Sequence, residues 1–232
     1  MTFIVVNFIF IILIFLISAV IARILIPRIL LISLRKKLFD IPDDRKVHKR
    51  AIPRLGGVSF FPTTLFAFCL VYTFRLLGGD SVSTLYASYL LPELLLFACG
   101  MTLLYLTGIA DDLVGVRYRQ KFVIQIFCAC LFPLSGLWIN DLYGLFGIHE
   151  LSVYVGIPFT ILTVVFITNA INLIDGIDGL ASGLSSVALL IFTFLFIQKG
   201  LWSYAMLAAG TFGVPVPFFY YNVFGSVERA RK

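Results

Sequence analysis

FIVVNFIFIILIFLISAVIA, residues 3–22, is a run of twenty residues that only Asn7 and Ser18 interrupt with polar side chains. An α-helix needs about 20 predominantly apolar residues to cross the hydrocarbon core of a bilayer, so this run is long enough to span a membrane. No basic residue precedes it, and no small-x-small cleavage pattern leads from it into a polar region. These features favour a retained span over a cleaved signal peptide and predict an integral membrane protein.

The rest of the chain has the same apolar character. Of its 232 residues, 60% are hydrophobic and 13% are charged, whereas about 25% of the residues of a soluble domain are charged. We therefore expect an all-α, polytopic integral membrane protein that forms a single membrane domain over residues 1–232. Seven spans are expected, at about 3–24, 57–76, 91–110, 122–139, 153–170, 183–197 and 202–222.

Basic residues are unevenly distributed among the linkers between these spans. Eight Lys and Arg side chains lie in residues 35–54, three in the 111–121 linker and three in the C-terminal tail, whereas linkers 77–90 and 140–152 contain none. By the positive-inside rule we expect the N-terminus outside, with the basic linkers, residues 171–182 and the tail at the cytoplasmic face. The net charge of +6 therefore gathers on one membrane surface and indicates anionic ligands, with no support for nucleic-acid binding.

Seven of the twelve acidic residues lie in linkers at this same predicted face. Asp111 and Asp112 are adjacent like charges at the C-terminal end of a span, where the helix dipole also disfavours anions, so they require a nearby cation. Carboxylates persist beside hydrocarbon when they face a polar cavity or a cation. We favour a metal ion as this cation, and a solvated helix end is the alternative interpretation.

The segment Asn169-Ala-Ile-Asn172-Leu-Ile-Asp175-Gly-Ile-Asp178-Gly repeats an oxygen-bearing side chain every third residue. On a helix, Asn169, Asn172 and Asp175 would lie on one broad face, and the glycines that follow would let the chain turn and bring Asp178 back. Hard oxygen ligands of this kind suit Mg²⁺, and Mn²⁺ could substitute for it. A capped helix terminus without a metal is the alternative.

Basic side chains that can bind phosphate accompany these acids. Lys121 lies nine residues after Asp112, at the start of the fourth predicted span. A basic run beside a membrane is by itself usually a determinant of topology. The first linker, however, holds a second basic cluster that ends in paired glycines, which let a backbone approach a ligand closely; its members are Lys46, His48, Lys49, Arg50, Arg54, Gly56 and Gly57.

Three motifs occur in a fixed order along the chain. They are PRLGG at residues 53–57, DDLVG at residues 111–115 with Lys121 and Gln125 after it, and NAINLIDGIDGLA at residues 169–181. In this order, and over essentially the whole chain, they resemble the polyprenyl-phosphate N-acetylhexosamine-1-phosphate transferases. These are membrane enzymes of glycosyltransferase family 4 that begin bacterial envelope glycan synthesis. The Asn-Asp motif is the most specific of the three and the Gly-Gly motif the least.

The resemblance implies transfer of a sugar-1-phosphate from a UDP-N-acetylhexosamine, by default UDP-GlcNAc, to undecaprenyl phosphate, with release of UMP. The reaction would serve cell-wall or lipopolysaccharide synthesis at the cytoplasmic face of the bacterial plasma (inner) membrane. Asp111, Asp112 and Lys121 would be catalytic, with Lys121 holding the lipid phosphate, and Asn172 would bind Mg²⁺ together with the two aspartates. The substrate-binding residues would be Asn169, Asp175, Asp178, Lys46, His48, Arg54, Gly56 and Gly57.

Family members usually continue through further spans, which carry a Gly-Asp-x-Gly-Ser motif and a His-rich basic loop. Neither feature occurs in these 232 residues. We therefore expect the N-terminal part of a larger transferase domain, with little transferase activity by itself, which robust UMP release would contradict. The alternative is an inactive or split membrane subunit that binds nucleotide-sugar or lipid phosphate without turnover; a homodimer and a complementing C-terminal chain both stay open.

Two other functional classes are disfavoured by the placement of the acidic residues. CDP-alcohol phosphotransferases need an Arg soon after the first Asp-Gly and two further Asp residues, but no Asp follows Asp178. A transporter would carry its acidic residues near the bilayer midplane. Here they lie at one predicted surface.

Overall fold

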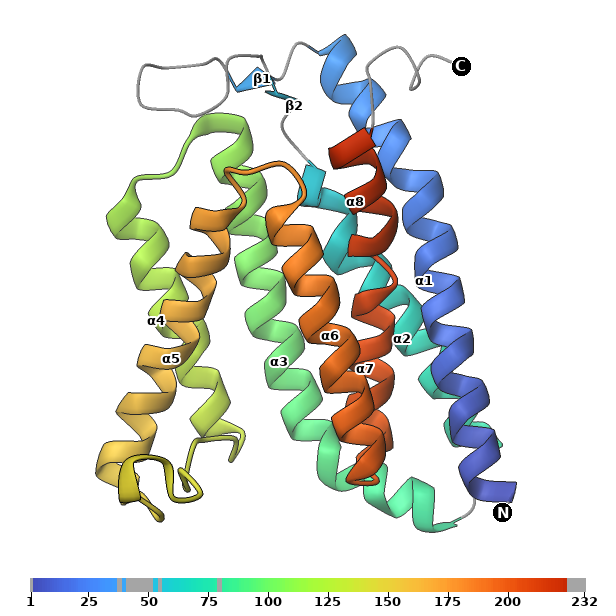
Figure 1. The fold of residues 1–232 in the computed structure, drawn as a ribbon, viewed down its shortest axis with the longest axis vertical. Coiled ribbons are helices and arrows are strands. Elements are labelled where there is room, and N and C mark those ends of the chain that lie inside the picture. Colours follow the sequence, from blue (N-terminus) through green and yellow to red (C-terminus); the bar gives the residue numbers. More distant parts are fainter. Residues whose placement is uncertain (1, 37–38, 41–51, 54–55, 79–80, 225–232) are drawn as a thin grey trace. The chain divides into compact units, whose positions relative to one another are not determined.

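The computed structural model describes residues 2–36, 39–40, 52–53, 56–78 and 81–224. Helices make up nearly all of this part of the chain (Figure 1), which confirms the predicted all-α class. A two-residue antiparallel pair lies in the first linker, where β1 (Phe39–Asp40) pairs with β2 (Ile52–Pro53). The helices are α1 Thr2–Arg35, η1 Gly56–Ser59, α2 Phe60–Leu77, α3 Ser81–Val114, α4 Tyr118–Leu134, η2 Leu145–Gly147, α5 Val153–Ile174, α6 Leu180–Gln198, α7 Trp202–Phe212 and α8 Pro215–Phe224.

Five helical segments in the described part of the chain are long and apolar enough to cross a membrane. They coincide with five of the seven predicted spans and confirm a multi-pass membrane protein. The fourth predicted span corresponds to the 17-residue α4, and the seventh to α7 and α8 together. The number of spans and the side on which the N-terminus lies stay predictions. The five segments are Phe3–Ser33, Gly56–Leu77, Ser88–Val114, Val153–Ile174 and Leu180–Gln198.

Two helices are longer than predicted. Helix α1 continues to Arg35, past the predicted end at residue 24, and α3 begins at Ser81, before the predicted start at residue 91. Each carries a proline inside, Pro27 and Pro92 respectively. Membrane helices tolerate such a proline because neighbouring helices and local adjustments satisfy the freed carbonyl group. The apolar runs were therefore a correct indicator of helix and a poor indicator of where each helix ends.

Two predicted spans end early or break, one at Gly136 and the other between Gly213 and Pro215. Helix α4 ends at Leu134, before the predicted residue 139, because Gly136 adopts a left-handed φ of 91° and the N–H of Leu137 donates to the carbonyl oxygen of Phe132 at 3.0 Å. Residues 202–222 form two helices. The break falls after Gly213, where an added Cβ would lie within 2.7 Å of the Phe15 carbonyl oxygen on α1.

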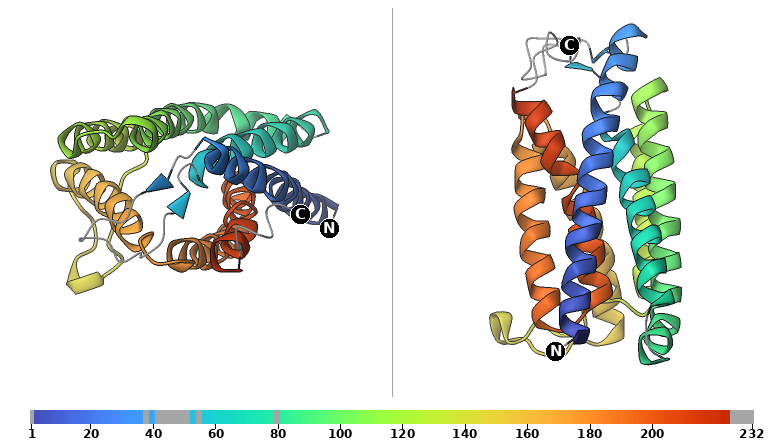
Figure 2. Two further views of the ribbon diagram at one scale, coloured as in Figure 1. Left: turned by 90° about the horizontal axis from the view of Figure 1, so that it is seen from above. Right: turned by 90° about the vertical axis from the view of Figure 1, so that its right-hand side faces the viewer.

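The chain divides into two compact units, of which unit 1 contains residues 1–80 and 174–232. Its helices are α1, α2, α6, α7 and α8, and α7 and α8 follow one another along α1 (Figures 1 and 2). A hydrophobic cluster joins α1, the start of α2 and α8. Its buried centre is Ala22, Ile26 and Val214, and Leu30, Phe60, Phe218 and Tyr221 pack against it.

Aromatic contacts fix the two ends of unit 1. The Phe60 and Phe218 rings, at the start of α2 and in α8, have centroids 5.0 Å apart. At the other end, Phe3 and Phe8 of α1 lie 6.3 and 5.9 Å from Trp202, which begins α7. The end of α1, the start of α2 and the end of α8 therefore share one end of this unit, as the distribution of basic linkers predicts.

Unit 2 contains residues 81–173, with α3, α4 and nearly all of α5. Helices α3 and α4 are close at Gly100, whose carbonyl oxygen accepts a hydrogen bond from the Cys128 thiol at 3.5 Å. The loop after α4 packs on the start of α5, where the Ile139 N–H donates to Thr160 Oγ1 at 2.8 Å. The end of α5 therefore returns to the end of the unit at which α3 stops and α4 begins.

Candidate functional site

Asp111 lies in the last turn of α3, where the chain turns toward α4. Gly115 ends the helix with a φ of 74°, and its N–H donates to the Asp111 carbonyl oxygen at 3.0 Å. The Asp111 carboxylate accepts a second backbone hydrogen bond, from the Val116 N–H to Oδ1 at 2.9 Å. The carboxylate therefore organises the turn that follows its own helix, and Gly115 supplies the left-handed conformation that this turn requires.

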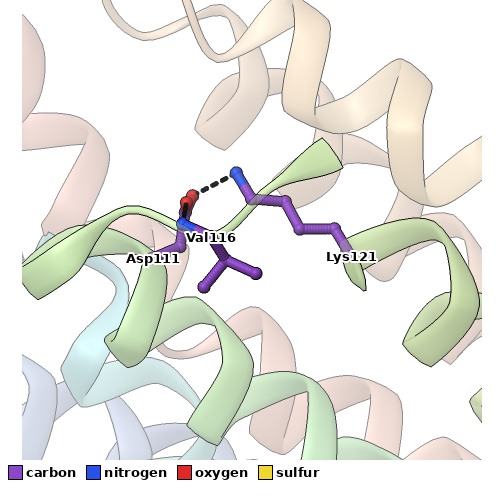
Figure 3. A network of polar contacts seen from close by, with 3 residues as sticks. All are labelled: Asp111, Val116 and Lys121. Carbon is purple, nitrogen blue, oxygen red and sulfur yellow. Dashed lines mark hydrogen bonds and ion pairs between the residues drawn. The ribbon is translucent and has the colours of Figure 1, made fainter. Parts of the chain in front are cut away.

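Lys121 provides the cation that a carboxylate at a helix C-terminus needs. Its Nζ donates to Asp111 Oδ2 at 2.5 Å, so the two Asp111 oxygens are bound by Lys121 and Val116 respectively (Figure 3). The side chains of Lys121 and Asp111 are 37% and 33% exposed, so both remain open to water or a ligand. Sequence reasoning favoured a metal as this cation, and the structure supplies an ammonium group for one of the two aspartates.

A second polar contact connects α5 to the α4 face that carries Lys121. Asn169 Nδ2 donates to Gln125 Oε1 at 2.7 Å and to the Val165 carbonyl oxygen at 2.8 Å. Gln125 is four residues after Lys121, and side chains at this spacing are neighbours on a helix surface. In the sequence, Gln125 occurs only as a residue that follows the DDLVG motif. Its four-residue spacing from Lys121 is the feature that could have indicated its role.

Unit 2 thus contains all four of the predicted catalytic and metal-binding residues, Asp111, Asp112, Lys121 and Asn172. Asp112, adjacent to Asp111 in α3, is half-buried, and Asn172 is exposed in the last turn of α5. Asn169 and Asn172 both lie in α5, three residues apart, as the predicted helical face requires. Among the described residues, no three His, Cys, Asp or Glu side chains cluster closely enough to hold a metal ion.

The remaining described site residues belong to unit 1. Asp175 and Asp178 are exposed in the turn between α5 and α6. Gly179 begins α6 with a φ of 77°, and an added Cβ would lie within 3.1 Å of the Phe219 ring of α8. The turn was predicted to use two glycines, but Gly176 has no left-handed φ and Gly179 alone of the two supplies it.

The paired glycines of the first motif differ from each other in the structure. Gly56 faces α8, since an added Cβ would lie 3.0 Å from the Phe218 ring. Gly57 is exposed, with nothing within 4 Å of such a Cβ. Close packing of helices therefore accounts for Gly56, whereas Gly57 keeps the open surface that a ligand needs. The predicted residues Lys46, His48 and Arg54 lie outside the described residues, with Lys49 and Arg50.

Comparison with known proteins places this chain in a family. The sequence model described as glycosyl transferase family 4 matches residues 94–227. A Bacillus subtilis (strain 168) protein named as a probable undecaprenyl-phosphate N-acetylglucosaminyl 1-phosphate transferase is 29% identical over 192 residues, which cover 82% of this chain and 49% of the relative.

Enterobacterial relatives give the same result. The undecaprenyl-phosphate alpha-N-acetylglucosaminyl 1-phosphate transferase of Yersinia pestis is 31% identical over 184 residues, or 76% of this chain and 46% of the relative. The protein of that name in Escherichia coli (strain K12) is 28% identical over 186 residues, or 77% and 46%.

The fold is that of a multi-pass membrane protein, and the relatives that it matches are named as undecaprenyl-phosphate N-acetylglucosaminyl 1-phosphate transferases. The chain belongs to glycosyl transferase family 4, because the family model covers more than half of it. It spans about half the length of the relatives that it matches. The resemblance inferred from the three sequence motifs is thereby confirmed.

Proposed function

We propose that this chain carries the lipid-phosphate and metal-binding part of a transferase that moves GlcNAc-1-phosphate from UDP-GlcNAc to undecaprenyl phosphate. The observation that carries the proposal is the pair of Lys121 and Asp111 at the end of α3, in a membrane protein whose relatives are named for this reaction. The predicted setting is the cytoplasmic face of a bacterial plasma membrane, where a soluble nucleotide-sugar meets a lipid phosphate. The product would enter an envelope polysaccharide.

The chemistry is a phosphoryl transfer between two substrates. An oxygen of the undecaprenyl phosphate forms a bond to the phosphorus that bears the sugar, and the bond from that phosphorus to the bridging oxygen breaks. UMP leaves with the bridging oxygen, and the product is undecaprenyl diphosphate-GlcNAc. Because all of these groups are anionic, the protein contributes mainly charge compensation and positioning.

Lys121 and Asp111 would act at the acceptor. The ammonium group is positioned by a carboxylate that is itself held by the Val116 N–H, so Lys121 has a defined place beside the end of α3. An incoming lipid phosphate is a stronger anionic partner than a half-solvated carboxylate, so it can share or replace Asp111 as the acceptor of the ammonium N–H groups. Asp111 would then position Lys121 and accept its hydrogen bonds between turnovers.

Mg²⁺ fits the donor set of unit 2 in chemical type. Asp112 and Asn172 supply hard oxygen atoms at the same end of the unit, and Asp111 supplies another when Lys121 binds phosphate. Mg²⁺ keeps several waters and binds substrate phosphates together with one or two carboxylates, so it does not need a cage of three acidic side chains. When bound, it would neutralise the diphosphate and the leaving UMP.

The donor would be bound by Asn169, Asp175, Asp178 and the basic first linker. Asn169 is oriented by Gln125 of α4, and the two aspartates are exposed in the turn before α6. Gly57, exposed in η1 just before α2, would allow close approach of the sugar nucleotide. In a complete enzyme that contains this segment, Asp112→Asn or Asp178→Asn should abolish transfer and leave membrane insertion intact.

Two parallel measurements in lipid nanodiscs test the proposal. Calorimetric titration of the purified chain with UDP-GlcNAc, with and without Mg²⁺, measures donor binding. UMP release in the presence of undecaprenyl phosphate is measured in a complete enzyme that contains this segment, because the chain by itself is expected to release little. Release above that of the Asp178→Asn variant supports the transferase. Donor binding by the chain without release by the complete enzyme favours the alternative of a binding subunit without turnover, and absence of both signals contradicts both proposals.

A further inference from the structure

A hollow lies between α3 and α4 and borders the Asp111–Lys121 pair at Val116, whose N–H donates to Asp111. We call it the α3–α4 hollow; it has a volume of about 670 Å³ and lies entirely within unit 2. Its lining is mostly apolar, with the polar side chains of Thr107 and Gln120 and, near the turn between the helices, a guanidinium group. The lining residues that matter here are Leu106, Ala110, Val116, Arg119, Val123 and Ile124.

This hollow uses a different face of α4 from the candidate transferase site. Lys121 and Gln125 are four residues apart and lie on one side of the helix, with Lys121 bound to Asp111. Arg119 and Val123 are also four residues apart. Arg119 precedes Lys121 by two residues, and at about 100° per residue this separation turns the two side chains to opposite sides. The cation of the hollow, Arg119, is therefore distinct from Lys121, the cation of the proposed acceptor site, although Val116 contacts both regions.

Arg119 is held in place by its neighbour. Its Nε–H donates to the Tyr118 hydroxyl oxygen at 2.9 Å, and its guanidinium carbon lies 5.7 Å from the centroid of the Tyr118 ring. A guanidinium carries four further N–H donors on its two terminal nitrogens, in the planar arrangement that binds phosphate. An exposed tyrosine beside a cation at the end of a membrane helix is typical of the headgroup region.

The charge pattern identifies the occupant. A cation at one end of an apolar hollow, on helices that cross a membrane, matches an amphiphile with one anionic headgroup and hydrocarbon chains. We propose that the α3–α4 hollow binds an anionic phospholipid of the surrounding leaflet, with its phosphate on Arg119 and an acyl chain along Leu106, Ala110 and Val123. The site depends on the membrane character of the chain and does not depend on the proposed transferase function.

Photo-crosslinking in nanodiscs tests the site directly. The 232-residue chain is placed in phosphatidylcholine discs that contain a trace of phosphatidylglycerol with a diazirine in one acyl chain, or phosphatidylcholine with the same chain. Mass spectrometry then maps the labelled residues. A basic residue near an anionic headgroup contributes about 1 kcal/mol, so phosphatidylglycerol should label residues 106–124 about fivefold more than phosphatidylcholine.

Two variants and two matched controls separate specific binding from ordinary lipid contact. Arg119→Gln should reduce phosphatidylglycerol labelling to the phosphatidylcholine level, and Val123→Phe should reduce it by filling the hollow. Arg117→Gln removes a neighbouring exposed charge, and Leu113→Phe enlarges a nearby exposed residue; neither residue lines the hollow, so both variants should keep the wild-type labelling. If Val123→Phe fails to fold, the headgroup comparison and Arg119→Gln carry the test without it.

Four results would overturn the proposal. Equal labelling by both lipids would show annular contact without recognition of charge. Unchanged labelling in Arg119→Gln would remove the guanidinium from the site. Displacement of the phosphatidylglycerol by stoichiometric undecaprenyl phosphate would make the hollow part of the acceptor site, and absence of labelling in residues 106–124 would show that protein covers it.

Discussion

Two basic side chains of this protein occupy opposite environments, Lys121 in unit 2 and Arg75 in unit 1. Lys121 is 37% exposed and is paired with the Asp111 carboxylate at 2.5 Å. Arg75 is 6% exposed, and its Nε–H donates to the neutral Asn7 side chain at 2.8 Å. Its guanidinium carbon also lies 5.8 Å from the centroid of the Tyr72 ring.

The comparison distinguishes a charged side chain that is accessible to a ligand, Lys121, from one that holds helices together, Arg75. A half-solvated ion pair adds only about 0.2–1 kcal/mol to stability, because water already solvates both partners. Lys121 can therefore exchange its partner for a phosphate at low cost. Arg75 joins α2 to α1 through Asn7, and the neighbouring Tyr72 hydroxyl lies 3.2 Å from Ser203 of α7. Loss of a group from this buried cluster affects the contacts of three helices.

The largest expected effect is on transfer by a Lys121→Met variant. Removal of the ammonium group should lower UMP release about 100- to 1,000-fold in a complete transferase that contains this segment, because charge compensation at the reacting phosphates is lost. The free energy of unfolding should change by less than about 1 kcal/mol. Lys199→Met, in the turn between α6 and α7, is the matched control and should keep full activity. Wild-type release by Lys121→Met would remove Lys121 from the chemistry.

Arg75→Leu should show the reverse pattern. Truncating this buried guanidinium leaves the Asn7 amide oxygen without its donor, which should lower the free energy of unfolding in detergent micelles by about 3 kcal/mol. UDP-GlcNAc binding by the folded fraction should not change. The double variant Asn7→Leu/Arg75→Leu removes both partners and should recover part of the loss. A single variant as stable as wild type would mean that Arg75 is not a structural element.

The sequence predicts those features that depend on neighbours along the chain. Apolar runs identify the helices because backbone hydrogen bonds within a bilayer must be satisfied locally, and the three-residue spacing places Asn169 and Asn172 on one helix. The ends of the helices were predicted poorly, because Pro27 continues α1 whereas Gly136 ends α4. Both outcomes depend on packing and backbone conformation that hydropathy does not encode.

Contacts between distant segments could not be predicted in the same way. The pairing of Arg75 with Asn7 brings together residues that are 68 positions apart, and no pattern along the chain connects them. Gly56 was assigned to ligand binding, but its close neighbour is Phe218, which only the fold brings near. The pair of Asp111 and Lys121 is closer in sequence, and there the need for a cation was inferred. The structure shows Lys121 beside Asp111, and the metal ion stays a prediction.

Gly179→Ala tests whether the turn before α6 is packed against α8 or is open to solvent. An alanine there would have to adopt a φ of 77° and would place its Cβ 2.4 Å from Val223 Cγ2 of α8. The combined strain and overpacking should cost about 2–3 kcal/mol of unfolding free energy. Gly115→Ala has a similar φ of 74° with open space around it, so it should cost only about 1 kcal/mol. Equal losses would mean that α8 does not constrain this turn.

The smallest expected effect is the coupling between Asp111 and Lys121, measured by a double-variant cycle in unfolding free energy. Asp111→Asn keeps a side-chain oxygen that can accept the Val116 N–H, so the cycle with Lys121→Met isolates the ion pair. The coupling should be about 0.5 kcal/mol and should decrease in high salt, because both groups are partly exposed. The corresponding cycle for Asn7 and Arg75 should give about 1–3 kcal/mol with little dependence on salt, because that pair is buried. Coupling of equal size in the two cycles would contradict the distinction between a charge kept accessible for phosphate and a charge enclosed by helices.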